Sequence, residues 1–288
     1  FKTQETTVYA HEENNNNSLV NNYVRKLVFD NRSKLWIATS AGLDMFDPVE
    51  ELFVHYSEIN PLLNVDVVTI FADKDNRILV GTYFNGMVII NLLNDNITSF
   101  IPDPSNERSY NVYAIIRDSE GILWIGTRGG LYLYDEDKEK ISWIKNDIHE
   151  DRSLIHNSIM DITEDAKGDM WIGTRSGLSY MVKEKQVFEK YIAIPENEQY
   201  LNNSEVYYIW IDETDKIWMG TENGGINILD REKGVFTYLT RENSGLSNNC
   251  IKTIQPLGDG NVLIGTYLGG LNVYNKNTGE IACFKHDE

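Results

Sequence analysis

The stretch LWIGTRGGLYLYD, from Leu123 to Asp135, decides the fold of this chain of 288 residues. In it, a short apolar run ends in a glycine-threonine pair and turns at once into a second apolar run. Five further copies read LWIATSAGLDMFD from Leu35, ILVGTYFNGMVIIN from Ile78, MWIGTRSGLSYMV from Met170, IWMGTENGGINIL from Ile217 and VLIGTYLGGLNVY from Val262. Successive copies begin 43 to 47 residues apart. A period this regular over nearly the whole chain indicates a repeat architecture.

Each copy is the centre of a unit that we interpret as four short strands. In the third unit the β-rich runs are residues 111–117, 122–126, 131–134 and 141–145, with polar or glycine turns between them. Four strands joined by tight turns form an antiparallel meander, and such a unit repeated every 40 to 50 residues or so is typical of a β-propeller. The chain shows no helical periodicity, which excludes an all-helical solenoid. The fold class that we predict is therefore all-β.

The recurring residues of the motif have structural interpretations. We expect the four tryptophans of the second strands to pack between adjacent blades: Trp36, Trp124, Trp171 and Trp218. The glycine before threonine allows another backbone to approach closely. The threonine is expected to cap the hairpin that follows it.

The strand count exceeds six whole units. Full repeats occupy about 20–57, 65–101, 110–146, 157–193, 204–241 and 249–286, within one predicted domain over 1–288. Residues 1–13 contain an extra strand, Thr7 to Ala10, which resembles the closing strand of a preceding blade. Either the chain is six repeats of a seven-bladed propeller, or it is a six-bladed propeller with a surplus strand. We favour the seven-bladed propeller, because the sequence stops abruptly at a repeat edge.

The charge, the apolar runs and the cysteines of the chain argue against several classes of function. The chain has 26 basic and 44 acidic residues, a net charge of −18, which argues against a nucleic-acid-binding surface. No apolar run approaches the roughly 20 residues that span a bilayer. Cys250 and Cys283 fall in the first and last strands of the sixth repeat, too far apart for a disulfide. We predict two free, mostly buried thiols.

The consensus D-x-x-G-x-[LI]-W-I-G-T-x-x-G-L-x-x-[YF]-D resembles the propeller repeat of two-component regulators, known from the extracellular sensor regions of hybrid two-component systems in Bacteroides-type bacteria. The resemblance covers all six units and is strongest over residues 118–131. The first unit departs from it with Ala38 in place of glycine, and the second and sixth with Leu79 and Leu263 in place of tryptophan.

The resemblance implies a periplasmic input domain of an inner-membrane receptor. In that family two propellers and an immunoglobulin-like domain precede a membrane span, and a histidine kinase, a receiver and a DNA-binding domain follow it. The implied signal is an oligosaccharide, and the receptor controls polysaccharide utilisation. The partners expected for this chain are therefore the sugar, the adjacent propeller and immunoglobulin-like domains, and a second copy in a homodimer. The chain would meet the membrane only through its parent protein.

A ligand site is expected at the turns between second and third strands, which open on the same end of a propeller as the connectors between blades. The residues of these turns differ from one repeat to the next, whereas the strand residues on either side of them stay the same. This contrast is typical of a common scaffold whose exposed loops carry the function. Aromatic rings there suit a pyranose, and arginine suits a carboxylate. The alternative is that exposed turns tolerate any polar residue. The candidate residues are Tyr83, Phe84, Asn85, Arg128, Arg175, Glu222, Asn223 and Tyr267.

Catalysis and metal binding find little support. We place the five histidines in outer strands or connectors rather than at a common site: His11, His55, His149, His156 and His286. No Cys/His metal spacing and no G-x-S-x-G elbow occur. The acidic turns lack the oxygen density of a calcium loop. We therefore expect no cofactor, no metal and no enzymatic activity. A protein-interaction scaffold is the main alternative to a sensor, and a propeller hydrolase or lyase is the less favoured one.

Overall fold

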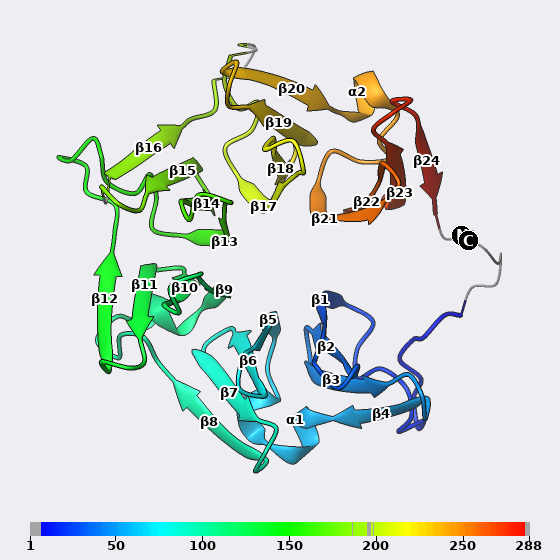
Figure 1. Cartoon of the computed structure of the whole chain (residues 1–288). Helices are drawn as coiled ribbons and strands as arrows, with labels where there is room; N and C mark the ends of the chain where they lie inside the picture. Colours follow the sequence, from blue (N-terminus) through cyan, green and yellow to red (C-terminus); the bar gives the residue numbers. More distant parts are fainter. Residues whose placement is uncertain (1–6, 186, 195–196, 198, 286–288) are drawn as a thin grey trace. The chain divides into compact units, whose positions relative to one another are not determined.

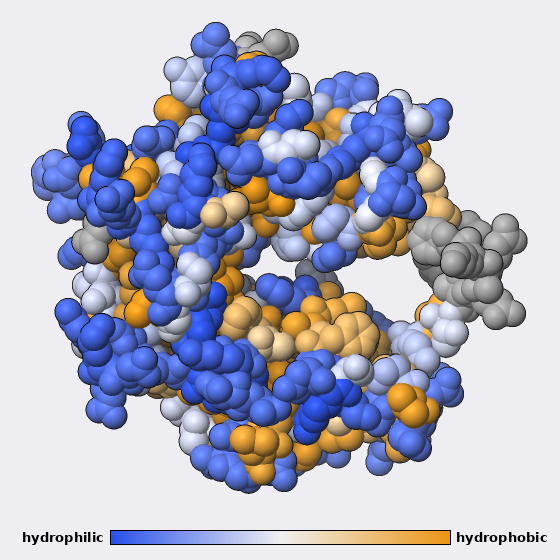
Figure 2. All heavy atoms as spheres, in the orientation of Figure 1, coloured by the Kyte–Doolittle hydropathy of each residue, from blue (hydrophilic) through white to orange (hydrophobic). Residues whose placement is uncertain are grey.

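The computed structural model describes residues 7–185, 187–194, 197 and 199–285. In this part of the chain the strands form six four-stranded sheets, and the strands of each sheet follow one another in chain order. We number the sheets 1 to 6, from β1–β4 to β21–β24 (Figure 1). The predicted all-β meanders are therefore confirmed. Figure 2 shows hydrophilic residues over most of the surface in view, in keeping with the large number of charged side chains.

The chain divides into two compact units, which are described separately. The first comprises residues 1–117 and 127–129, and the second comprises residues 118–126 and 130–288. The first unit holds sheet 1, sheet 2 and β9, the first strand of sheet 3. The second unit holds β11, β12, most of β10 and the whole of sheets 4, 5 and 6.

The strands of the first unit are β1 Val24–Phe29, β2 Leu35–Thr39, β3 Gly42–Asp47, β4 Leu52–His55, β5 Val67–Asp73, β6 Arg77–Thr82, β7 Met87–Asn91, β8 Asn96–Phe100 and β9 Val112–Arg117. Three short helical turns accompany them: α1 Tyr56–Ile59, η1 Pro61–Leu63 and η2 Glu107–Tyr110. The first strands lie side by side, β1 beside β5 and β5 beside β9. The core between sheets 1 and 2 includes Trp36, Leu63, Val67 and Ile70, all fully buried.

The strands of the second unit are β10 Leu123–Thr127, β11 Gly130–Asp135, β12 Lys140–Ile144, β13 Ile159–Glu164, β14 Met170–Thr174, β15 Gly177–Val182, β16 Val187–Tyr191, β17 Val206–Ile211, β18 Ile217–Thr221, β19 Ile226–Asp230, β20 Val235–Leu239, β21 Ile251–Gly258, β22 Asn261–Thr266, β23 Gly270–Asn275 and β24 Ile281–Phe284. One short helix, α2 Arg241–Ser244, follows β20. No helix among the described residues is long and apolar enough to cross a membrane.

Cores in the second unit form between successive sheets. Trp171 of sheet 4 packs with Val206 and Phe236 of sheet 5, and Trp218 of sheet 5 packs with Ile251 and Ile254 of sheet 6. The tryptophan therefore occupies the interior between neighbouring sheets, as the sequence predicts. Burial of such large rings supplies much of the apolar driving force for stacking the sheets.

The glycine-threonine pair acts as expected. Thr174 donates through Oγ1 to the carbonyl of Gly177 at 2.8 Å, which closes the hairpin. A Cβ atom on Gly173 would lie 2.8 Å from the carbonyl oxygen of Val206 in the next sheet. Because only glycine leaves room for that approach, the residue fixes the distance between sheets 4 and 5.

The predicted strand from Thr7 to Ala10 is not assigned as a strand, and residues 1–6 lie outside the described structure. Tyr9 instead packs on the aromatic rings of sheet 1, with its centroid 4.8 Å from Phe46 and 5.8 Å from Phe53. In the described structure, this segment belongs to none of the six sheets. The extra strand is therefore not confirmed.

The two cysteines are free, as predicted, and lie at opposite edges of sheet 6. Cys250 is buried beside β21, whereas Cys283 is exposed on β24. The expectation that both thiols are buried is therefore wrong for Cys283. The reason is the exposure of this outermost strand, where three of the four residues are exposed.

Candidate ligand-binding hairpins

The hairpin between the second and third strands opens, in each sheet, beside the connector that leads into the first strand. The residue after the threonine donates its backbone N–H to the carbonyl of the last residue of that connector, directly before the first strand. In the first unit Tyr83 bonds Asp66 at 3.0 Å, and in the second unit Glu222 bonds Glu205 at 3.1 Å. The placement of hairpin and connector at one end of each sheet is thus confirmed.

Two of the longer hairpins carry a large apolar residue in left-handed backbone. Phe84 has φ 73° and is 74% exposed, and Leu268 has φ 54° and is 87% exposed. A bulky side chain rarely adopts this conformation, which costs free energy in a turn. Both tips therefore combine an unfavourable backbone conformation with an exposed apolar side chain.

An aromatic cluster surrounds Tyr83 in the first unit. Its ring lies 5.9 Å from Phe84 and 5.6 Å from Tyr113. The guanidinium of Arg25 lies 5.7 Å from the Tyr83 ring and forms a two-pronged pair with Asp66 at 2.6 and 2.5 Å. Burial lowers the pKa of Arg25, but the hydrogen bonds and charge of Asp66 outweigh it and raise the pKa. The arginine is therefore a fixed cation beside flat aromatic faces.

The other two candidates of the first unit differ from each other. Asn85 donates through its side chain to the carbonyl of Leu62 at 3.2 Å, so its amide holds the connector in place. Arg128 is exposed, and its backbone N–H bonds the carbonyl of Asn111 at 3.1 Å. Its guanidinium makes no ion pair with the described residues. Arg128 is thus available to a ligand, whereas Asn85 has a structural contact.

A linked polar cluster lies at the hairpin end of the second unit. Lys252 pairs with Glu222 at 3.0 Å and lies 5.6 Å from the ring centroid of Tyr267 and 4.7 Å from that of Tyr207. Tyr207 donates to Oε2 of Glu205 at 2.8 Å. The structure therefore brings the predicted residues Glu222 and Tyr267 together through a lysine that the sequence analysis did not single out.

Arg175 belongs to the same cluster through Tyr207. Burial raises the pKa of Tyr207, and so do the hydrogen bond to Glu205 and the charge of Glu222, while the charge of Arg175 opposes them. Arg175 is therefore close enough to act on the phenol electrostatically. Asn223 is exposed at the hairpin tip, with no side-chain hydrogen bond to the described residues.

The residues that sequence reasoning missed share one structural position, a β-bulge in the first strand. Val206 pairs with Thr221 and Tyr208 with Gly220, so Tyr207 is the extra residue between them. The register shifts in the same way around Arg25 in β1 and around Lys252 in β21. A bulge takes a residue out of the ladder and redirects its side chain, a device common beside binding sites.

A signal for these residues was present in the sequence. Every first strand begins with valine or isoleucine and has isoleucine or leucine three residues later. The second residue, by contrast, varies as freely as the hairpins do. It is Arg25, Val68, Tyr113, Met160, Tyr207 and Lys252 in turn.

The described histidines make local contacts. His55 pairs with Asp44 at 2.7 Å, and His11 contacts the carbonyl of Leu19 at 2.6 Å. The ring of His156 accepts from the backbone of Ser158, and His149 is bonded through its backbone to Asp147. His286 lies outside the described residues. Among the described residues no group of three His, Cys, Asp or Glu side chains could hold a metal ion.

Comparison with known proteins agrees with this architecture. The model of the two component regulator propeller family matches residues 106–129 and 153–176. Histidine kinase P4 of Formosa agariphila is 27% identical over 157 residues, which cover 49% of this chain and 11% of the kinase.

Two solved structures share the fold. The extracellular domain assigned to a hybrid two component system of B. thetaiotaomicron is 21% identical, with a TM-score of 0.62, over 100% of this chain and 43% of that one. PorZ, a surface component of the type-IX secretion system of Porphyromonas gingivalis, is 16% identical, with a TM-score of 0.54, over 90% of this chain and 47% of that one. The chain thus spans less than half the length of these relatives. It carries the repeat of the two component regulator propellers.

Proposed function

We propose that this chain is part of the periplasmic input region of a hybrid two-component receptor and that its hairpin end binds an oligosaccharide. The observation that carries the proposal is the linked cluster of the second unit. There the rings of Tyr207 and Tyr267 flank Lys252, which pairs with Glu222. Flat rings pack on the apolar face of a pyranose, and charged groups bond its hydroxyls.

The first unit offers the same chemistry. Tyr83, Phe84 and Tyr113 form an aromatic group beside the Arg25–Asp66 pair. The exposed Phe84 ring adds an apolar contact at a strained tip. Each unit thus presents aromatic faces and charged groups at its hairpin end, which supports recognition of a polyhydroxylated ligand.

The kinase and receptor relatives support the wider assignment. In the receptor that we propose, the chain adjoins a second propeller and an immunoglobulin-like domain, precedes an inner-membrane span and acts as a homodimer. Ligand binding shifts the receptor between two arrangements, which requires a different affinity for each. The output is a histidine kinase that controls polysaccharide utilisation.

Calorimetry with a panel of oligosaccharides tests the proposal. Binding without turnover is expected for at least one of them. Arg175→Ala and Arg128→Ala should each weaken it about ten-fold, which corresponds to about 1.4 kcal/mol. Arg152→Ala, which alters an exposed arginine of a connector, is the matched control. Unchanged affinity in both hairpin variants would contradict the site, and turnover of the sugar would identify an enzyme.

The alternative function is a protein-interaction scaffold. It predicts that no saccharide in the panel binds and that the hairpin variants instead lose a protein partner. The strained, exposed Phe84 and Leu268 favour this alternative, since apolar tips also suit a protein surface.

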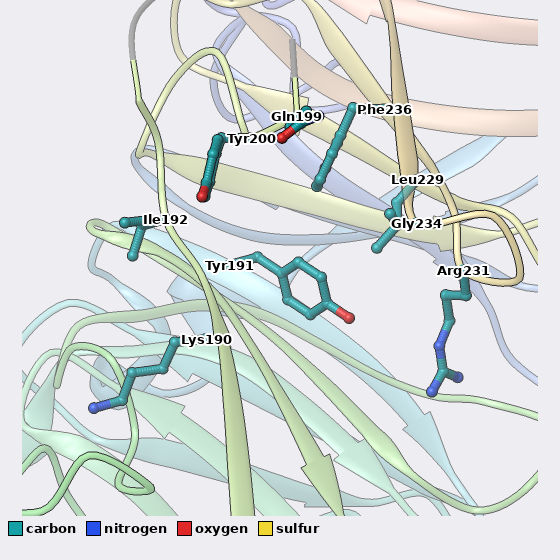
Figure 3. A pocket seen from close by; sticks show the side chains of 9 residues that line it. All are labelled: Lys190, Tyr191, Ile192, Gln199, Tyr200, Leu229, Arg231, Gly234 and Phe236. Carbon is teal, nitrogen blue, oxygen red and sulfur yellow. The ribbon is translucent and has the colours of Figure 1, made fainter. Parts of the chain in front are cut away.

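We also propose that the propeller has seven blades. Tyr9 packs on Phe46 and Phe53 of sheet 1 much as Tyr191 of sheet 4 packs on Phe236 of sheet 5, at a centroid distance of 6.3 Å (Figure 3). This similarity in packing supports the proposal that residues 7–10 belong to the fourth strand of a preceding blade. In a structure of the parent protein, Thr7 to Ala10 should pair with a strand of a further repeat. Finding these residues unpaired there would exclude the seventh blade.

A further inference from the structure

A buried carboxylate holds the connector that leads into sheet 1. Asp44, the third residue of β3, has no exposed surface, and its Oδ2 accepts from the backbone N–H of Val20 at 2.8 Å. The corresponding residues of sheets 4, 5 and 6 bond their connectors in the same way, but they are the uncharged Ser179, Asn227 and Asn272. Because an uncharged side chain is enough for this contact, the charge of Asp44 needs a separate explanation.

The charge of Asp44 is used by His55, the last residue of β4. The two residues lie directly opposite each other in the register of β3 and β4. The Nδ1 atom of His55 lies 2.7 Å from Oδ1 of Asp44, and its Nε2 atom lies 2.9 Å from the carbonyl oxygen of Asn16. The side chain of His55 is only 11% exposed. The imidazole is therefore held between sheet 1 and the segment that precedes it in the chain.

This geometry fixes the number of protons on the pair. A backbone carbonyl only accepts hydrogen bonds, so Nε2 of His55 must carry a hydrogen. The second bond needs another hydrogen, either on Nδ1 facing an ionised Asp44 or on Asp44 facing a bare Nδ1. In both cases the pair holds one proton more than a neutral imidazole beside a carboxylate. Contact with Asn16 therefore requires the protonated pair.

The surroundings keep this proton on the pair. Burial lowers the pKa of His55, but the hydrogen bond and the charge of Asp44 outweigh it and raise the pKa. Glu58 of α1 acts in the same direction. Burial raises the pKa of Asp44 by more than the bonds to His55 and Val20 and the charge of His11 lower it. Both shifts favour the proton-bound form.

The segment that receives this bond comprises residues 11–22 and reaches sheet 1 beside β4 (Figure 1). The side chain of Asn17 accepts from the backbone N–H of Phe53 at 2.8 Å and donates to the carbonyl of Glu51 at 3.0 Å. These groups are uncharged and do not titrate. The Asp44–His55 pair thus adds a pH-dependent bond to contacts that are independent of pH.

From these features we propose that Asp44 and His55 form a proton-dependent clasp, which fastens residues 11–22 to sheet 1. With the proton bound, the imidazole joins Asp44 to the carbonyl of Asn16. When the proton leaves for solvent, one N–H remains, and it stays with the carboxylate because a charged acceptor forms the stronger bond. The lone pair of Nε2 then faces the carbonyl of Asn16, and the segment loosens. The clasp does not depend on the function proposed for the hairpins.

The direction of the pH dependence follows from the raised pKa of His55. The pKa of an unfolded histidine is about 6.5. The contact is therefore complete below about pH 6.5 and is lost as the pH rises through the higher folded value. Residues 11–22 are thus held more firmly in mildly acidic than in alkaline surroundings.

Hydrogen–deuterium exchange of the whole chain, followed by mass spectrometry from about pH 6 to pH 9, tests the clasp. Protection factors, corrected for the intrinsic exchange rate at each pH, should fall several-fold for peptides within residues 11–22. The connector before sheet 6 is the internal control, because the uncharged Asn272 holds the backbone of Ser247 there. Protection of that connector should stay constant over the same range.

Two substitutions separate proton binding from packing. His55→Gln cannot titrate, so protection of residues 11–22 should no longer change with pH. In Asp44→Asn the amide can accept from Val20 and donate to a bare Nδ1, so a neutral His55 keeps its bond to Asn16. Protection in this variant should therefore persist to about pH 9. His149→Gln alters an exposed histidine of a connector and should leave the pH dependence of the parent protein unchanged.

Three outcomes would overturn the proposal. The first is equal protection of residues 11–22 in the parent protein at both ends of the pH range. The others are an unaltered pH dependence in His55→Gln and a loss of protection at high pH in Asp44→Asn. If His55→Gln does not fold, NMR titration of the His55 ring in the parent protein decides. A pKa above about 6.5 supports the clasp, and a pKa at or below that value contradicts it.

Discussion

The indole Nε1 of Trp124 donates a hydrogen bond of 2.7 Å to Oδ2 of Asp118, six residues earlier in the chain. Oδ1 of the same carboxylate accepts from the backbone of Glu120 and Ile122. Lys183, from sheet 4, approaches Oδ2 at 2.8 Å. One buried carboxylate therefore holds a turn, a core tryptophan and a neighbouring sheet. The arrangement recurs for Asp165 with Trp171 and Arg231, and for Asp212 with Trp218 and Lys276.

Removing this carboxylate should destabilise the second unit strongly. Asp118→Ala leaves the indole N–H and the Lys183 ammonium without their buried partner, at a cost of about 3–5 kcal/mol. Urea unfolding followed by tryptophan fluorescence measures the change. Asp135→Ala, which removes an ion pair with the exposed Lys138, is the control and should cost less than about 1 kcal/mol. Equal effects of the two substitutions would contradict the role of Asp118.

The glycine of the repeat should not tolerate a methyl group where the next sheet lies against it. Gly173→Ala places a Cβ 2.8 Å from the carbonyl oxygen of Val206, so sheets 4 and 5 must move apart. Overpacking of this kind costs about 1–3 kcal/mol. Gly279→Ala is the comparison, because nothing lies within 4 Å of its added Cβ and only its backbone angle is unfavourable. Thermal unfolding should rank Gly173→Ala as the less stable variant.

Acid should weaken the ion pairs of Asp73 in the first unit. Burial raises the pKa of Asp73, but hydrogen bonds and charges from Arg117 and Arg77 outweigh it and lower the pKa. The stabilisation is therefore full above the unfolded value of about 3.9 and is lost as the pH falls through the lower folded value.

The comparison of the parent protein with Asp73→Asn tests this. Their difference in unfolding free energy should be large at pH 7 and should shrink as the pH falls below about 4. Urea titrations at several pH values measure it. A difference that is constant from pH 7 to pH 3 would show that the charge of Asp73 does not stabilise the fold.

Substitution of Lys252, the bulge residue of β21, should change ligand affinity without changing the stability of the fold. Lys252 and Glu222 are partly exposed, so Lys252→Glu should change the unfolding free energy by no more than about 1 kcal/mol. It also places a carboxylate between Tyr207 and Tyr267, and we expect saccharide affinity to fall at least ten-fold. Lys276→Met should lower the unfolding free energy and leave saccharide affinity unchanged, because Lys276 pairs with the buried Asp212. A Lys252→Glu variant that binds normally would remove this residue from the site.

Much of the fold could be predicted because the same sequence motif occurs in all six repeats. Apolar runs, turn residues and the glycine-threonine pair all indicate the same meander, and this agreement across levels makes the prediction secure. The segment from Thr7 to Ala10 shows the limit. Its residues favour a strand, but a strand also needs a neighbouring strand that accepts and donates its backbone hydrogen bonds. The local sequence does not show whether such a neighbour is present.

The site was only partly predictable, for a related reason. Hairpin residues such as Tyr83 and Arg175 stand out because turns are recognisable from glycine and spacing. Tyr207 and Lys252 sit inside strands, where an alternating pattern assigns every residue to one face or the other. A bulge breaks that alternation and is a property of the register between two strands. Only comparison among the repeats could have drawn attention to these residues.

The bulge also has a consequence for how such a chain can evolve. An extra residue that belongs to no ladder can be exchanged without disturbing the aliphatic residues on either side of it. Arginine, valine, tyrosine, methionine and lysine all occur there within this one chain. In sheets 1, 2, 4, 5 and 6 the first strand therefore has one position at which the side chain can change while folding is preserved, so the surface built on these bulges can be altered without rebuilding the scaffold.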